Sequence, residues 1–118
     1  MDAEARALAK VLLAHHRAVC WPKRGTQPSI ESCLITYGVP CDRAGAPHLQ
    51  RSVGGFLAQV AGWCEKNGWP PINALAVNKE LRMPGGGYDG APGCSLLNWP
   101  AEVRAAIDCE NYPLTLDL

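Results

Sequence analysis

The residues best able to do chemistry follow one short apolar run near the middle of the 118-residue chain. Two prolines and the apolar run 72–77 come first, and a glycine-rich turn comes after. The polar side chains between them are Asn78, Lys79, Glu80 and Arg82. Lys and Arg can fix phosphate groups and Asn can read a base edge, and the same side chains also suit a protein interface. The plain alternative is a solvated turn in which Arg82 lies along the surface.

The glycine-rich turn at residues 84–87 is a second candidate, because backbone N–H groups in such a turn can cradle a phosphate. A phosphate-binding loop of the nucleotide hydrolases would continue with Gly-Lys-Ser/Thr, and a dinucleotide site would place G-x-G-x-x-G at the start of a helix. Neither pattern is present, so we expect no nucleotide cofactor.

Cysteine and histidine are the remaining candidates for chemistry. They occur as Cys20, Cys33, Cys41, Cys64, Cys94, Cys109, His15, His16 and His48. No Cys-x-x-Cys pair exists and the histidines do not lie at zinc-ligand spacing, so we expect no metal site. No local signature supports a Cys–His nucleophile pair. We therefore expect buried free thiols, no catalytic residue and no cofactor, and keep a small Cys- or His-dependent hydrolase or transferase as a third hypothesis.

The charge of the chain is balanced overall but divided along the sequence. The formal net charge is zero, which argues against a strongly basic nucleic-acid binder. Residues 1–82 hold ten of eleven Lys and Arg and six of eleven Asp and Glu, and residues 83–118 hold the rest. Either the folded surface has a positive and a negative side, or the opposite charges meet and cancel. Candidate contacts to nucleic acid or to an acidic partner are Lys23, Arg24 and Arg51.

The N-terminus is polar and lacks the apolar core of a signal peptide, and no apolar run is long enough to span a bilayer. These features predict a cytoplasmic protein with no membrane partner.

Helical periodicity dominates the elements that must position these residues. The chain is expected to form helices at 2–19, 28–37 and 48–67, a buried strand at 72–77, a helix beginning near Asn98, and a short strand within 112–118 beside the central one. The third helix has the clearest apolar stripe, and Gly54 and Gly55 within it indicate close approach of another backbone. Gly38 and Gly68 are expected to end the second and third helices.

This order predicts one α+β domain, 1–118, mainly helical, with three helices, a short strand–loop unit and a C-terminal helix. By analogy of fold the arrangement is winged-helix-like. The four tryptophans lie near expected helix ends or turns, where most would complete the core, and an exposed one would suit a protein interface. We add Trp69 and Tyr88 to the candidate partner-binding residues.

The central segment resembles one found in small phage, prophage and defence-associated bacterial proteins. Its form there is Pro-Pro-Leu-x-Ala-Leu-Val-Val-x-Lys, then Pro-Gly-x-Gly and an aromatic residue, matched here by residues 70–79 and 84–88. Two helices precede this segment in those proteins, and residues 29–38 and 51–68 here are similar to them, so the resemblance covers residues 28–88. The sequence departs from it at Leu81-Arg82-Met83, where a Thr-Gly pair is usual. The resemblance implies a fold and carries no catalytic residues.

Small phage proteins of this size commonly bind a host protein, and inhibitors of bacterial immunity such as anti-CRISPR proteins are one such group. We therefore expect a non-enzymatic protein that inhibits a host defence complex by protein–protein contact. The alternative is a winged-helix DNA-binding protein, whose affinity would fall steeply with salt.

Overall fold

The computed structural model describes residues 1–25, 29–48 and 52–114. In these ranges the fold is α+β and mainly helical. The α-helices are α1 (Ala3–His15), α2 (Gly38–Arg43), α3 (Val53–Lys66) and α4 (Trp99–Asp108). The strands are β1 (Ile35–Thr36) and β2 (Ala76–Val77), and shorter helical turns lie at His16–Cys20, Trp21–Lys23, Ile30–Cys33 and Ile72–Leu75.

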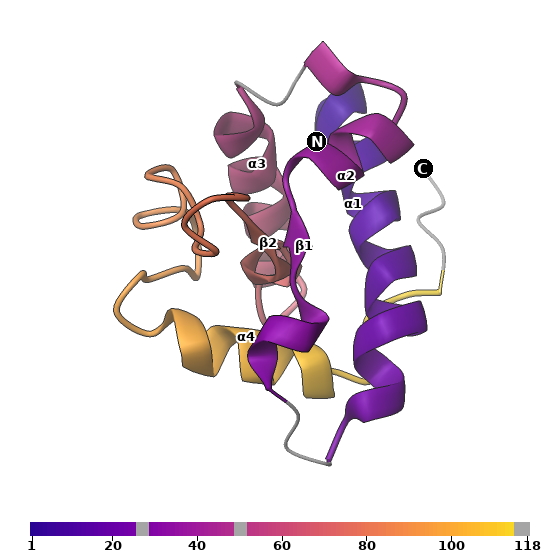
Figure 1. The fold of residues 1–118 in the computed structure, drawn as a ribbon, viewed down its shortest axis with the longest axis vertical. Helices are drawn as coiled ribbons and strands as arrows, with labels where there is room; N and C mark the ends of the chain where they lie inside the picture. Colours follow the sequence, from indigo (N-terminus) through magenta and orange to yellow (C-terminus); the bar gives the residue numbers. More distant parts are fainter. Residues whose placement is uncertain (26–28, 49–51, 115–118) are drawn as a thin grey trace.

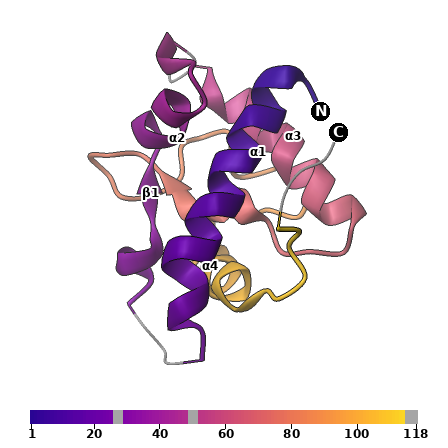
Figure 2. The same ribbon diagram turned by 90° about the vertical axis from the view of Figure 1, so that its right-hand side faces the viewer.

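The helices surround the central segment. Figure 1 shows α4 below α3, with one end directed towards the lower part of the helical segment that begins with α1, and Figure 2 shows α4 end-on beside that lower part. α1 packs against α3, and the turn Ile72–Leu75 contacts α1, α3 and α4. Every residue from 72 to 77 is buried, so this segment is the centre of the hydrophobic core.

Only the last two residues of the strand expected at 72–77 form a strand. Ile72–Leu75 is a 3₁₀ turn, closed by a hydrogen bond from the Ala74 amide to the Pro71 carbonyl at 3.1 Å. Because helices pack around this turn, no neighbouring strand can pair with its backbone, and buried backbone groups must find partners locally. β2 then pairs with β1 in parallel, with Ile35 opposite Ala76 and Thr36 opposite Val77.

The prediction of a helix at 28–37 is wrong. Its described part forms one 3₁₀ turn, Ile30–Cys33, and then β1. Ile35 and Thr36 are β-branched and suit a strand, and their pairing satisfies the backbone of β2. Gly38 begins α2 instead of ending a helix, so the connector expected after it is partly helical. The strand expected within 112–118 falls largely outside the described residues.

The other helices are confirmed in type, with shorter bounds. The first continues from α1 through a π turn at His16–Cys20, and α3 buries Val53, Leu57 and Val60. Gly68 adopts φ 74° after α3, and the Trp69 amide bonds back to the Cys64 carbonyl at 2.9 Å, which ends the helix as expected.

The wing of a winged-helix protein is an antiparallel hairpin, whereas the strands described here are parallel.

The described ranges contain no helix that is long and apolar enough to cross a membrane.

Candidate functional site

The polar residues after β2 form a tight turn, residues 78–83. The Asn78 Oδ1 atom accepts the backbone N–H groups of Glu80 and Leu81 at 2.8 and 3.1 Å. The Asn78 amide donates to the Met83 carbonyl at 2.8 Å, and the Arg82 amide donates to the Asn78 carbonyl at 2.9 Å. This network fixes the backbone, because Asn side chains mimic backbone groups in such turns.

Arg82 joins the turn to the rest of the fold. Its backbone is left-handed, with φ 55°, which costs a non-glycine residue roughly 1–2 kcal/mol. Its Nε and Nη2 atoms both donate to Glu31 Oε2, at 3.1 and 2.9 Å. The pair is largely exposed, so it contributes little energy but holds the turn against the 3₁₀ turn Ile30–Cys33.

The outer face of the turn is apolar at its tip. The Leu81 side chain is 72% exposed and Met83 is 42% exposed, and Lys79 and Glu80 are exposed beside them. Arg82 also borders an open groove of about 600 Å³ that includes Ile35 and Thr36 of β1. We call the turn, together with this groove that it meets at Arg82, the outer surface.

The inner face of the same segment borders a smaller cavity of about 270 Å³, which we call the inner pocket. One wall is apolar and is formed by Val53, Leu57 and Ala58 of α3. The remaining lining is polar or glycine and is formed by Tyr37, Gly54, Asn73, Asn78, Gly85, Gly86, Gly87 and Tyr88. No charged side chain belongs to this lining, as far as the described residues show.

The glycine turn closes the inner pocket. The Tyr37 hydroxyl accepts the Gly85 N–H at 2.5 Å. A Cβ atom on Gly87 would lie 3.5 Å from the Gly54 Cα, so the turn packs its backbone directly on α3. The close approach predicted for the glycines of the third helix is confirmed at Gly54.

Tyr88 and Trp69 are not part of the outer surface. Tyr88 is 6% exposed and its hydroxyl donates to Glu102 Oε1, while burial raises its pKa. Trp69 is half-buried between Trp63 and Tyr112, at ring-centroid distances of 5.0 and 5.9 Å. The candidate role of Tyr88 as an exposed anchor is corrected, because its side chain is buried. Trp69 packs against the core but stays half-buried.

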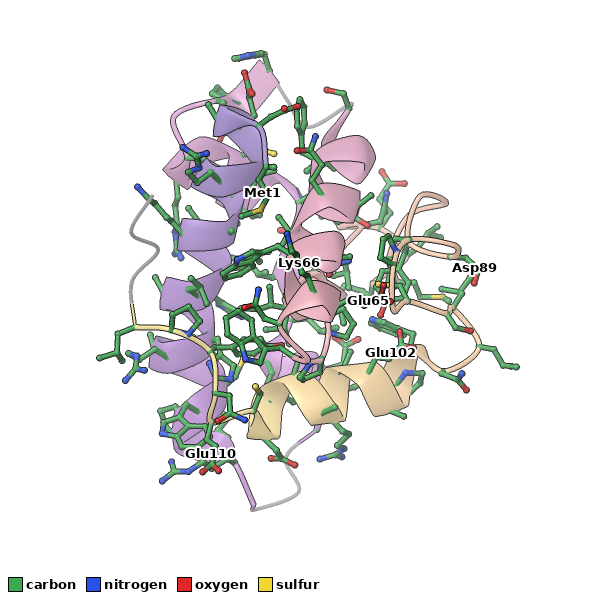
Figure 3. All side chains as sticks on the ribbon, turned by 180° about the vertical axis from the view of Figure 1, so that it is seen from behind. Met1, Glu65, Lys66, Asp89, Glu102 and Glu110 are labelled. Carbon is green, nitrogen blue, oxygen red and sulfur yellow. The ribbon has the colours of Figure 1, made fainter. Side chains whose placement is uncertain are left out.

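Glu102 connects α4 to the loop beyond Tyr88. It also accepts the Ser95 N–H, at 3.1 Å to Oε1 and 3.2 Å to Oε2, and the Asp89 Oδ1 atom accepts the Leu96 N–H at 2.9 Å. Figure 3 shows Glu102 on the side of α4 that faces the loop of Asp89. The wall of the inner pocket at Tyr88 is therefore anchored to α4.

The basic residues expected to contact nucleic acid make contacts within the fold. The Lys23 ammonium donates to the Ser32 carbonyl at 3.2 Å. The Arg24 guanidinium lies 3.9 Å from the centroid of the Trp21 ring and donates to the Trp21 carbonyl at 2.8 Å. Arg51 lies outside the described residues.

The thiols and imidazoles do not assemble into a site. All six cysteines are free, and only Cys94 is more than slightly exposed. Burial raises the pKa of Cys64 to about 12, which disfavours a thiolate there. His15 and His16 are buried, and each uses Nε2 on a backbone carbonyl, of Cys33 and Ile107. No metal-binding group of three His, Cys, Asp or Glu occurs in the described part of the chain.

Two polar residues of the inner pocket were not predicted from the sequence. Tyr37 fell within the helix expected at 28–37, and Asn73 was read as part of the apolar run. One signal could have identified Asn73, since it is the one polar residue within 72–77. An amide in a fully buried segment must either be paired or serve a ligand.

Comparison of the chain with models of protein families, with curated proteins and with solved structures gives no match.

Proposed function

We propose that this chain is a non-enzymatic binding protein whose turn 78–83 inserts Leu81 into a partner protein. The observation that carries the proposal is the 72% exposure of Leu81 on a backbone fixed by four hydrogen bonds. A backbone that is already fixed lowers the entropy lost when the exposed apolar side chain enters a partner, which is the general benefit of preorganisation.

The outer surface would supply the central part of such a contact. A stable interface covers about 800 Å² on each partner, roughly an eighth of the 6216 Å² surface of this chain. Leu81 and Met83 would form the centre, the groove beside β1 would add area, and Lys79 and Glu80 would form the polar rim.

The resemblance of residues 28–88 to phage and defence-associated proteins supports the choice of partner. We propose that the partner belongs to a host defence complex and that binding inhibits it, as anti-CRISPR proteins do.

DNA binding by the third helix is the weaker alternative. In α3 the cations are limited to Lys66, which lies beside Glu65 in the last turn. A helix that reads DNA needs several cations to fix phosphates. Such binding would fall steeply with salt.

The test is capture of partners from a bacterial lysate by the tagged protein, with and without nuclease. Leu81→Glu should lower retention of the captured complex about 30-fold, the loss expected for a hot spot of about 2 kcal/mol. Leu97→Glu is the matched control, because Leu97 is 90% exposed on a different loop. Circular dichroism should show that both variants remain folded.

A complex that survives nuclease and is lost only with Leu81→Glu supports the proposal. Equal capture by the two variants would remove the turn from the interface. Recovery of nucleic acid alone, released by moderate salt, would replace the proposal with the DNA-binding alternative.

A further inference from the structure

The inner pocket contains a buried amide that lacks a partner. Asn73 is 2% exposed, and its Nδ2 atom donates to the Cys94 Sγ at 3.6 Å. Its Oδ1 atom is buried and accepts no hydrogen bond from the described residues. Because a buried acceptor without a donor destabilises the fold, native structures keep one mainly where function requires it.

Other residues that line the inner pocket supply donors. The Tyr37 hydroxyl oxygen accepts the Gly85 N–H, so its own proton is available to another acceptor. Asn78 uses its Oδ1 atom within the turn, which leaves its Nδ2 group as a donor. Gly86 and Gly87 add backbone N–H groups that make no hydrogen bond with described residues.

The shape and charge of the inner pocket restrict its ligand further. The apolar wall of Val53, Leu57 and Ala58 suits the flat face of a ring. The cavity of about 270 Å³ lies just below the range of about 300–1,000 Å³ that holds drug-sized molecules, which indicates one ring system. No Lys or Arg is among the described lining residues, so a multiply charged phosphate group would lack a counter-charge.

We propose that the inner pocket binds a nucleobase, free or as the base of a nucleoside, by its hydrogen-bonding edge. Asn73 Oδ1 would accept an N–H group of the base, and the Tyr37 hydroxyl and the glycine amides would donate to its carbonyl or ring nitrogen atoms. Such an edge offers donors and acceptors side by side, and its ring faces are apolar. This inference uses the inner face of the segment and stands independently of the protein contact proposed for the outer face.

The test is titration of the ¹⁵N-labelled protein with adenine, cytosine, uracil and guanosine, followed by amide chemical shifts. Inorganic phosphate is titrated separately, to test whether the site binds anions instead. At least one base should shift the amides of Ala58, Gly86 and Gly87 in a saturable manner. Asn73→Leu and Ala58→Phe should each weaken that binding at least tenfold, the first by removing the acceptor and the second by filling the cavity.

Gly55→Ala is the matched control, since Gly55 lies on the same helix with no atom near its Cβ position, and it should bind as the parent does. Absence of saturable shifts with all four bases would overturn the proposal. It would also be overturned if phosphate alone shifted these amides, because the site would then bind anions. Ala58→Phe keeps the test decisive if Asn73→Leu is unfolded, because it leaves the buried amide in place.

Discussion

Asn73 and Arg82 show how single residues in this chain depart from what their surroundings favour. Asn73 places an amide in the core, and Arg82 adopts a backbone conformation that glycine adopts more easily. Both lie in the same short segment between Pro71 and the glycine turn. Unfavourable local choices of this kind concentrate at functional sites, where the surrounding structure over-determines them.

At the residue scale, the cysteines should differ in their reaction with iodoacetamide. Cys94 should be alkylated first in the native protein because the other five thiols are buried. Burial also raises the pKa of Cys94, so the reaction at pH 7 should be slower than in the urea-unfolded chain. Peptide mass spectrometry at several times measures the order. Rapid native labelling of Cys20 or Cys64 would contradict the burial described here.

The candidate site could be predicted from the sequence only in part. The polar turn was identified because its residues stand between an apolar run and a run of glycines. Asn73 and Tyr37 were missed because their role depends on contacts across the fold, with α3 and with the glycine turn. Trp69 and Tyr88 were candidates for an interface because a sequence does not distinguish an aromatic interface anchor from one that completes the core.

At the scale of elements, periodicity identified α1, α3 and α4 because each buries one face of a helix against the same core. Periodicity gave the wrong structure for short segments whose conformation depends on the neighbouring elements of the fold. Ile72–Leu75 is a 3₁₀ turn because helices surround it, and Ile35 and Thr36 form a strand because β2 requires a partner. Such tertiary effects override local preference in short segments.

Glu102 gives a prediction at the same scale, since it holds the loop beyond Tyr88 on α4. Glu102→Ala should lower the free energy of unfolding by about 2 kcal/mol, because the buried Tyr88 hydroxyl and the Ser95 amide lose their acceptor. Urea denaturation monitored by circular dichroism measures the change.

Glu110→Ala is the control, because Glu110 is exposed just beyond α4 (Figure 3) and should change stability by less than about 0.5 kcal/mol. Equal effects of the two substitutions would mean that Glu102 does not anchor the loop.

At the scale of the whole molecule, stability should depend on pH through two buried histidines. Burial is the main cause that lowers the pKa of His15 and of His16 below the ordinary value of 6.5, and hydrogen bonds to backbone carbonyls only partly oppose it. The unfolded chain therefore binds protons near pH 6.5 that the folded chain does not. The free energy of unfolding should be constant with respect to these groups above pH 6.5 and should fall below it.

The slope should be at most about 1.4 kcal/mol per pH unit for each histidine. Urea denaturation between pH 7.5 and pH 5 measures it. His15→Gln should flatten the slope, and His48→Gln, at an exposed position, should leave it unchanged. A slope in His15→Gln as steep as in the parent would show that other groups cause the pH dependence.

The parallel pairing of β1 with β2 has a consequence for the order of events during synthesis. Ile35 meets Ala76 only after the whole of α2 and α3 has been made, and the Tyr37 amide waits for the Val77 carbonyl. Pairings between distant residues form late, because a long loop must close before they add stability. A nascent chain that has emerged from the ribosome only as far as α3 would thus carry α1, α2 and α3 without the central segment 72–77. Their apolar faces would remain open to chaperones or to other nascent chains until residue 77 emerges.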